Sequence, residues 1–311
     1  MNSRKTRLSL LSNNSEFIIH QSGAVRSANQ RHLRALVFTL AVGVIAIRPQ
    51  QVVGVDLKPV TLDAFSRYVQ ATETRIQREL ARPDAFLYIE GLPEGQRAKI
   101  SKQLHDGQIY MEPLSTGDNA GQSIDVPDGL IHHWIGDVFV PGATVAQAIA
   151  LAEDYDHHQG TYPEVVRSRL LKREGNDFHI FYRLRKHKVI TATLDTEHDV
   201  HYFQDDAKRW HSVSISTRIA QVDDPGKPNE REKPVGHDDG FLWRIDSWWR
   251  FEQSDGGVYV ECESVSLTRD IPKGLGWLIE PFITSIPKES LQNTLGSTRS
   301  ALLARLAAGK P

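Results

Sequence analysis

The chain has 311 residues, of which 40% are hydrophobic, and this content is enough for one sizeable core with an attached smaller unit. Its single cysteine, Cys262, excludes an internal disulfide and any paired-cysteine metal or redox site, so stability has to come from packing. Residues 1–54 carry seven basic residues and one acid, and the remaining chain, with 30 basic and 38 acidic residues, has a net charge of −8, which argues against a nucleic-acid partner.

Residues 1–54 have the pattern of a targeting segment. The uncharged run ALVFTLAVGVIAI, between Arg34 and Arg48, is short for a membrane span but has the length of a signal-peptide core. Basic residues precede it, and Val52 and Gly54 form an imperfect small-x-small cleavage site. We therefore predict export to the periplasm or the extracellular space, with a mature chain that begins near Val55. An uncleaved leader that anchors the protein to a membrane is the alternative.

Residues 55–129 are predicted to form an α/β extension. Apolar residues recur close to helical spacing over 61–80, which predicts an amphipathic helix. Two short extended stretches are expected at 85–92 and 108–114. Residues 115–129 are rich in Ser, Gly, Asn and Asp, which is typical of a linker or a long surface loop, and we place the boundary of the extension there.

Residues 130–311 are predicted to form a second domain with one strand, one helix, about six strands and a long C-terminal helix. The first strand ends at a Pro-Gly pair, and Thr144 is the start signal of the following helix over 143–155. Turn residues then separate strand-like runs at the spacing of an antiparallel meander. A leucine stripe predicts the last helix, with Pro287 in its first turn and a shorter helix before it.

The segment 243–268, WRIDSWWRFEQSDGGVYVECESVSLT, is predicted to be a β-hairpin with a two-residue Asp255-Gly256 turn. This turn pairs Ser254 with Gly257 and sets Arg250 opposite Glu261. A slip by one residue would drive carboxylates into the apolar face, which is costly because buried charges lose their hydration. The charge pattern therefore favours the first register.

The two faces of this hairpin differ in chemistry. One face carries charged residues and is predicted to be a solvated or ion-paired surface; they are Arg244, Asp246, Arg250, Glu252, Glu261 and Glu263. The other face opposes large aromatic residues to small ones with hydroxyls, where a solid core would contain Leu, Ile and Val. Such a lining is typical of an internal cavity for a mostly apolar ligand, and close packing of the C-terminal helix on the small residues is the alternative. The predicted ligand-binding residues are Trp243, Ile245, Trp249, Phe251, Cys262, Ser264, Ser266, Thr268, Leu291 and Leu295.

The order of these elements resembles the START-like superfamily, also known as the polyketide cyclase and lipid-transport (SRPBCC) group. Two stretches carry the resemblance, IHHWIGDVFVPGATVAQAIALAEDYDHHQGTYPEVVRSRLL and SLTRDIPKGLGWLIEPFITSIPKESLQNTLGSTRSAL, and it covers about residues 130–306. The chain is also similar to exported bacterial proteins of this type that have no assigned activity. The resemblance implies an α+β helix-grip fold, in which a curved antiparallel sheet wraps around the C-terminal helix and a deep hydrophobic pocket. Members bind lipids, sterols, polyketides or quinones, and a minority are enzymes. Residues 55–129 have no counterpart in the minimal domain, and capping one end of the pocket is one role for them.

The histidines do not predict a metal site. Adjacent histidines on a strand, such as His132 and His133, point to opposite faces of the sheet. His157 and His158 lie at a helix end, where the helix dipole favours a histidine without any metal. We therefore expect neither a metal nor another cofactor.

Binding or transport of a hydrophobic small molecule or lipid, without a catalytic residue, is the function that these patterns favour. Arg183 and Arg185 would be a polar anchor for an anionic group if their strand turns them inward. One alternative is a cyclase or hydrolase that uses Tyr182, His187 or Asp246 as an acid or base in the same pocket. Another is a protein-interaction module with a filled core.

Overall fold

The computed structural model describes residues 55–311, apart from residues 83, 119, 188–190, 271–275 and 310–311, and for residues 276–284 it describes only the backbone. The chain divides into two units, residues 1–50 and 51–311, and all described residues belong to the second. The predicted leader, residues 1–54, lies outside the described residues. Within the described part of the chain, no helix combines the length and the apolar character that a membrane span needs.

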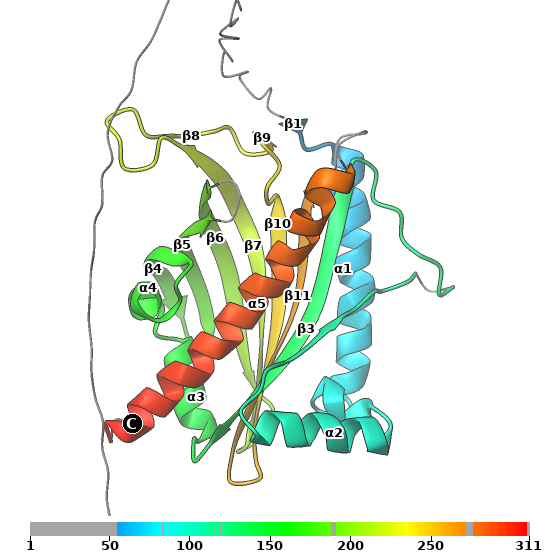
Figure 1. Ribbon diagram of the computed structural model, residues 1–311, viewed down its shortest axis with the longest axis vertical. Coiled ribbons are helices and arrows are strands. Elements are labelled where there is room, and N and C mark those ends of the chain that lie inside the picture. The colour runs from blue at the N-terminus through cyan, green and yellow to red at the C-terminus, as the bar shows by residue number, and fades with distance from the viewer. Residues whose placement is uncertain (1–54, 83, 119, 188–190, 271–275, 310–311) are drawn as a thin grey trace, which may run out of the picture. The chain divides into compact units, whose positions relative to one another are not determined.

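A large, curved antiparallel sheet is the centre of the described unit (Figure 1). Its strands lie in the order β2-β3-β11-β10-β7-β6-β5-β4, and the short β8 adds to β7. Two further short strands, β1 and β9, pair with each other. The strands are β1 (Val55–Asp56), β2 (Tyr110–Pro113), β3 (Gly129–Pro141), β4 (Val165–Glu174), β5 (Asp177–His187), β6 (Thr191–Gln204), β7 (Arg209–Asp223), β8 (Arg231–Glu232), β9 (His237–Asp238), β10 (Arg244–Ser254) and β11 (Gly257–Arg269).

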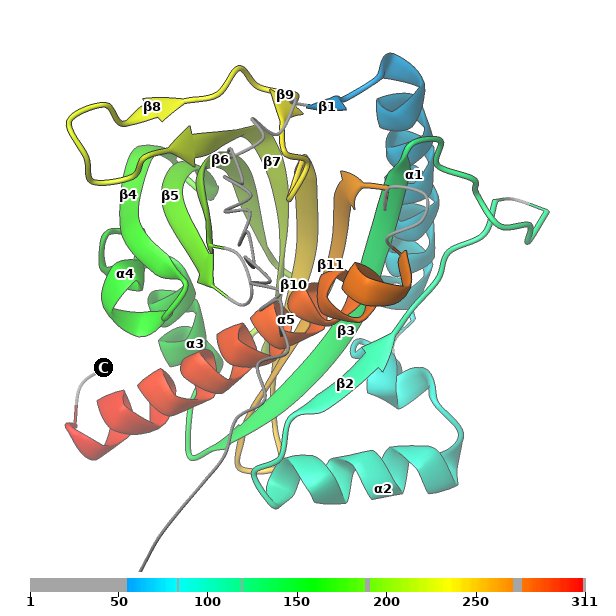
Figure 2. The same cartoon turned by 45° about the horizontal axis from the view of Figure 1, so that its top comes forward.

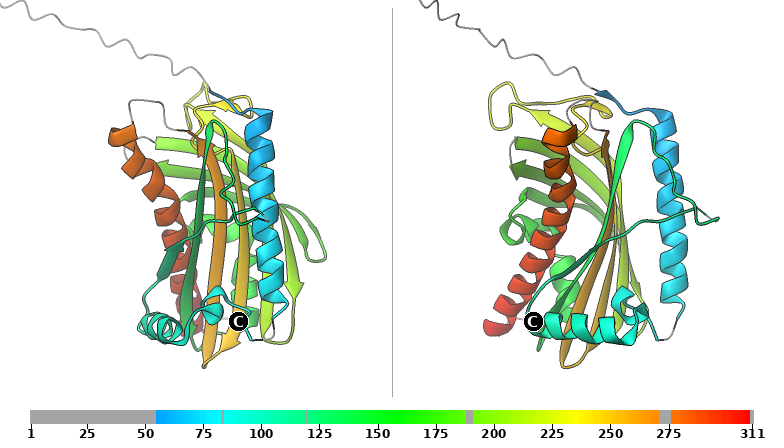
Figure 3. Two further views of the ribbon diagram at one scale, coloured as in Figure 1. Left: turned by 90° about the vertical axis from the view of Figure 1, so that its right-hand side faces the viewer. Right: turned by 45° about the vertical axis from the view of Figure 1, so that its right-hand side comes forward.

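Helices cover both faces of this sheet. The long helix α5 crosses its concave face, and α1 lies on the opposite face (Figures 2 and 3). The helices are α1 (Pro59–Leu80), η1 (Tyr88–Gly91), α2 (Glu94–His105), α3 (Val145–Ala152), η2 (Tyr155–His157), α4 (His158–Thr161) and α5 (Gly276–Ala307). From β3 onward, the long elements follow the predicted order of one strand, one helix, six strands and a long helix. The predicted α+β helix-grip architecture is therefore confirmed.

The predicted register of the hairpin is also confirmed. Ser254 pairs with Gly257, and Arg250 pairs with Glu261. The turn residues Asp255 and Gly256 have φ values of 53° and 75°, the left-handed conformation that a two-residue hairpin turn requires and that Asp and Gly tolerate best. The Asp-Gly signal and the alternating charges were therefore sufficient to define this part of the sheet.

Two local predictions were wrong. Residues 85–92 are not a strand, because η1 forms there, where the Glu90 carboxylate accepts a hydrogen bond from the Leu87 amide at 2.9 Å. The C-terminal region is one continuous helix from Gly276, so Pro287 lies in its interior rather than in its first turn. An interior proline loses one helical hydrogen bond. Packing of α5 against β3 and β11 outweighs that local break signal.

The extension that contains α1 packs on the outer face of the sheet and not on the side where α5 lies (Figure 3). Pro59 occupies the first turn of α1, where its missing amide hydrogen costs nothing. The apolar stripe of the helix, including Phe65, Val69 and Ile76, then packs against Trp248 and Val265. Residues 55–80 therefore form a second apolar layer behind the sheet.

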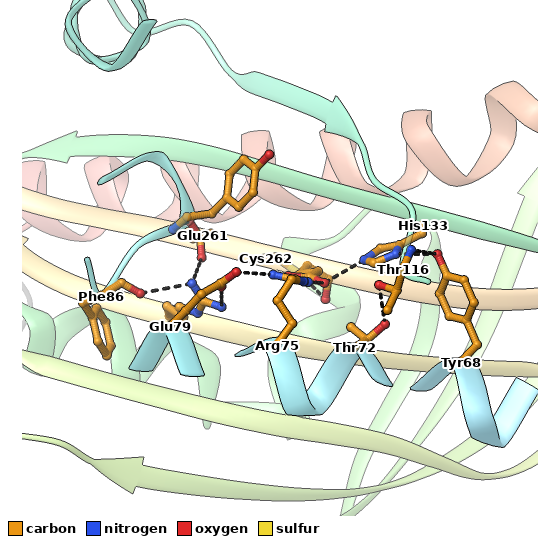
Figure 4. Close-up of polar contacts among 12 residues, drawn as sticks. Tyr68, Thr72, Arg75, Glu79, Phe86, Thr116, His133, Glu261 and Cys262 are labelled. Atoms are coloured by element: carbon orange, nitrogen blue, oxygen red, sulfur yellow. Dashed lines mark hydrogen bonds and ion pairs between the residues drawn. The ribbon is translucent and has the colours of Figure 1, made fainter. Parts of the chain in front are cut away.

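The charged face of the hairpin is buried beneath this extension (Figure 4), whereas the sequence analysis predicted that it would lie at the protein surface. Arg250 is 1% exposed and donates hydrogen bonds to Glu79 at 2.7 Å and to the Phe86 carbonyl at 3.1 Å. Arg75 of α1 pairs with both Glu79 and Glu263. The charged residues therefore form ion pairs, which was one of the two alternatives predicted from the sequence, but these pairs lie inside the protein and not on its surface.

The same interface contains a buried chain of hydrogen bonds (Figure 4). His133 Nε2 lies 2.7 Å from Glu263 Oε1, and His133 Nδ1 lies 2.9 Å from the Tyr68 hydroxyl. The Tyr68 oxygen also accepts a hydrogen bond from the Thr116 amide at 2.9 Å. Because a carboxylate oxygen only accepts, His133 donates to Glu263 from Nε2. The network therefore ties both α1 and the segment after β2 to the sheet.

Candidate functional site

A cavity of about 700 Å³ lies between the concave face of the sheet and α5. Strands β5, β6, β7, β10 and β11 supply its wall, and residues 158–164 and 286–298 close it. Side chains alternate between the two faces of a strand, so the lining residues of one strand come from alternate positions. On β11 these are Cys262, Ser264, Ser266 and Thr268, while Glu261 and Glu263 lie on the other face, where they contact η1 and α1.

Most of the wall is apolar. The apolar and aromatic lining residues are Ala152, Tyr155, Tyr162, Pro163, Val165, Ile180, Tyr182, Leu184, Ala192, Leu194, Val200, Tyr202, Phe241, Leu242, Ile245, Trp249, Phe251, Ile286, Pro287 and Leu291. Eight of the ten residues predicted to bind a ligand line the cavity: Ile245, Trp249, Phe251, Cys262, Ser264, Ser266, Thr268 and Leu291. Their role in binding remains a prediction.

Trp243 and Leu295 do not line the cavity. Trp243 precedes β10, in a bend where strand alternation does not hold, and its indole nitrogen donates to Asp238 at 3.1 Å under α1. Leu242 lines the cavity instead. Leu295 is fully buried where α5 packs against β3, and Gly136 leaves the space for it. Both residues therefore belong to the protein's own packing.

The proposed arginine anchor is also absent from the cavity. Arg183 forms two hydrogen bonds of 2.7 Å with Asp195, and neither it nor Arg185 is among the lining residues. The inward positions of β5 are Ile180, Tyr182, Leu184 and Lys186. The sequence pattern gave the alternation of β5 correctly but did not indicate which set of residues faces inward.

Charge is confined to three residues of the described lining. Lys186 and Glu164 pair with each other, and Glu164 also accepts hydrogen bonds from Ser290 at 2.9 Å and Asn293 at 3.2 Å. Arg269 ends β11 beside Gly240. The remaining wall is uncharged, so it suits an uncharged part of a ligand.

Three serines from neighbouring strands form a row across the wall. Ser247 of β10 pairs in register with Ser264 of β11 on one side and with Ser214 of β7 on the other. Adjacent strands lie about 4.8 Å apart, so the row presents three hydroxyls at that spacing. None of the three hydroxyls has a hydrogen-bond partner within the described residues. We call Ser214, Ser247 and Ser264 the serine row.

A second polar group of side chains comes from η2, α4, β5 and β6, and the sequence analysis named only Tyr182 among its members. The hydroxyls of Tyr155 and Tyr202 lie 2.8 Å apart. His158 Nδ1 lies 2.6 Å from the Tyr182 hydroxyl, and His158 Nε2 lies 3.1 Å from the Leu151 carbonyl oxygen. Strand alternation would have grouped Tyr182 with Ile180 and Leu184, but nothing in the sequence brings His158 to it.

Burial keeps these groups neutral. Desolvation lowers the pKa of His158 and of His198, another lining residue, to about 4 each. Desolvation also raises the pKa of the Tyr182 hydroxyl well above its ordinary value. At neutral pH the two imidazoles are therefore uncharged and the phenol keeps its proton.

No family model and no curated protein matches the chain. Solved structures with some similarity include a STAR-related lipid transfer protein from Xanthomonas axonopodis, with 16% identity, a TM-score of 0.38, and coverage of 62% of this chain and 98% of that one. The Zhui aromatase/cyclase from a Streptomyces species has 12% identity, a TM-score of 0.39, and coverage of 58% and 100%. Human STARD10 has 9% identity, a TM-score of 0.41, and coverage of 73% and 86%. The order and pairing of the chain's own elements, rather than these distant similarities, identify its fold as a helix grip.

Proposed function

We propose that the protein binds a hydrophobic small molecule or lipid in the cavity between the sheet and α5. The observation that carries this proposal is a cavity of about 700 Å³ that has an apolar wall and a row of hydroxyls without a partner among the described residues. Binding pockets for small molecules have this composition, with an apolar lining and a few polar groups that orient the ligand.

Burial of apolar surface would supply the affinity, at about 25 cal/mol for each Å² removed from water. The serine row would fix the ligand by hydrogen bonds, because each hydroxyl can either donate or accept. The buried part of the ligand would be uncharged, since a charge without a partner in this wall would be costly. Arg269 could pair with one negative group where β11 ends.

A catalytic role in the same cavity is the second candidate. Of the three residues that the sequence suggested as acid or base, Tyr182 lines the cavity and contacts His158. His187 is exposed beside Thr191, and Asp246 lies on the outer face, where its carboxylate accepts a hydrogen bond from the Ser216 amide. Tyr182 keeps its proton, which argues against a general base. An interaction module with a filled core has less support because the core contains this cavity.

Native mass spectrometry of the purified protein, with extraction of any bound molecule, tests the binding proposal. We expect a bound species of defined mass in the wild type and its loss in Ser247→Phe, which places a ring in the cavity. Ser254→Phe, at the exposed end of the same strand, is the matched control and should keep the ligand. A wild-type protein that carries nothing and ignores a panel of lipids and isoprenoids would contradict the proposal.

We also propose that residues 1–54 direct the chain out of the cytoplasm. The basic residues followed by the apolar run between Arg34 and Arg48 support this proposal. Mass spectrometry of the protein recovered from cell fractions tests it. A mature chain that begins near Val55 in the periplasm or medium is the expected result, an intact chain in the membrane fraction would indicate an uncleaved anchor, and an intact cytoplasmic chain would contradict export.

A further inference from the structure

The polar groups around Tyr182 allow their hydrogen atoms to be assigned. The Leu151 carbonyl oxygen can only accept, so His158 donates to it from Nε2. The Nδ1 atom of the neutral His158 is then an acceptor, and the Tyr182 hydroxyl donates to it at 2.6 Å. The hydrogen of Tyr182 is therefore already used, and its oxygen can only accept from a ligand.

The same reasoning applies to His198 on the neighbouring strand. The Thr196 hydroxyl lies 3.0 Å from His198 Nε2 and 3.4 Å from the Tyr182 carbonyl oxygen, and because that carbonyl can only accept, we assign the Thr196 hydrogen to it and a hydrogen to His198 Nε2. Because His198 is neutral, its Nδ1 atom carries a lone pair and no hydrogen. The ring is 7% exposed and lines the cavity, and Nδ1 has no partner within the described residues.

Tyr182 and His198 thus present acceptors rather than donors to the cavity. The ring centroids of Tyr182 and His198 are 5.9 Å apart, so their two open acceptor positions belong to one region of the wall. A ligand carbonyl or ether oxygen would receive no hydrogen bond from either of these two side chains. A carboxylate would face two lone pairs and lose its hydration, which is still less favourable.

We infer that this region is a subsite for a neutral hydroxyl group of the ligand, an alcohol or a phenol, whose hydrogen is accepted by His198 Nδ1. An imidazole nitrogen is a stronger acceptor than a phenol oxygen, which is why His198 rather than Tyr182 is assigned this role. This inference rests on the proposed function, because it specifies the ligand of the same cavity. His198 is then a residue that determines specificity between hydroxyl compounds and their ethers or ketones.

Binding of 1-naphthol and of its methyl ether, 1-methoxynaphthalene, measured by fluorescence titration, tests the subsite. The quantity of interest is the ratio of the two affinities. The ether is more hydrophobic than the naphthol in every variant, so this difference cancels when the ratio in a variant is compared with the ratio in the wild type. We expect His198→Phe to shift this ratio away from the naphthol by about threefold to tenfold, the net effect of one hydrogen bond. His201→Phe is the matched control, since this histidine of the same strand does not line the cavity and pairs with Asp177 instead, and it should leave the ratio unchanged.

A second measurement needs no substitution. In the ¹⁵N spectrum of the wild type, the unprotonated ring nitrogen of His198 should shift when naphthol binds and stay in place when the ether binds. An unchanged affinity ratio in His198→Phe, or a ring nitrogen that responds equally to both probes, would overturn the subsite and leave the binding function standing. If neither probe binds and no ligand is found by mass spectrometry, the proposed function fails and the subsite with it.

Discussion

Arg250 and Glu261 face each other across the β10–β11 hairpin, with 3.1 Å between Nη1 and Oε1, and their side chains are 2% and 1% exposed. Two strands and the N-terminal extension therefore meet at one buried ion pair, because Arg250 also donates to Glu79 and to the Phe86 carbonyl.

Replacement of Arg250 by Ala should destabilise the protein by about 3–5 kcal/mol, because it leaves the Glu261 carboxylate buried without its cation. Urea denaturation measures this difference in the free energy of unfolding. Arg218→Ala is the control, since Arg218 and its partner Glu232 are each about a third exposed, and it should cost less than about 1 kcal/mol. An equal decrease in the free energy of unfolding in the two variants would show that the buried ion pair contributes no more to stability than an exposed one.

The neighbouring Asp137 should make the protein less stable as the pH rises. This carboxyl is fully buried beside Glu261, and burial, followed by the charge of Glu261 and a hydrogen bond with it, raises its pKa well above 3.8, against the opposing effect of Arg250. Above about pH 4 the unfolded chain loses a proton that the native state keeps, so stability falls with pH up to the raised pKa.

Asp137→Asn removes this titration. We expect the variant to gain stability relative to the wild type between about pH 4 and pH 8 in thermal or urea unfolding, with little difference at the acid end. A constant difference across this range would mean that Asp137 is ionised in the native state.

The contact between α5 and β3 depends on a glycine. A Cβ atom at Gly136 would lie 2.5 Å from Met111 Sδ and 2.7 Å from Leu295 Cδ1, so Gly136→Ala should lower the free energy of unfolding by about 1–3 kcal/mol. Gly95→Ala is the opposite case, because a Cβ there has no neighbour within 4 Å and α2 gains from alanine, by up to about 1 kcal/mol. Chemical denaturation of the two variants should give shifts of opposite sign.

Glu164 connects the sheet edge to α5 through Lys186, Ser290 and Asn293. Glu164→Ala should therefore let α5 separate more readily from this edge and release a bound probe such as 1-naphthol about tenfold faster. Stopped-flow fluorescence measures the release rate. Lys172→Ala, which breaks an exposed pair with Glu174, should leave the rate unchanged. Equal release rates in both variants would place the exit elsewhere.

The sequence predicted the sheet better than the layers packed on it. The hairpin register followed from a turn type and from charges only a few residues apart, and strand alternation correctly placed seven of the eight hairpin residues predicted to line the cavity. Trp243 was assigned wrongly because alternation was extended one residue beyond the start of β10.

Contacts between residues far apart in the chain had no sequence signal. Nothing in the pattern of α1 indicated that Arg75 would meet Glu263, 188 residues later, so burial of the charged face could not be predicted. The pairing of His158 with Tyr182 likewise depends on how α4 packs against the sheet. The side on which Arg183 and Arg185 lie depends on the same long-range packing.

Strand β11 alternates between serving the cavity and serving the buried charges, with Cys262 and Ser264 on one side and Glu261 and Glu263 on the other. The alternation of side chains along β11 therefore determines both rows at once. A single-residue insertion or deletion in the middle of β11 would exchange the rows beyond that point, placing carboxylates against the ligand and serines against the arginines. We therefore expect a change in the length of this strand to abolish both folding and ligand binding, whereas a point substitution can change either property alone.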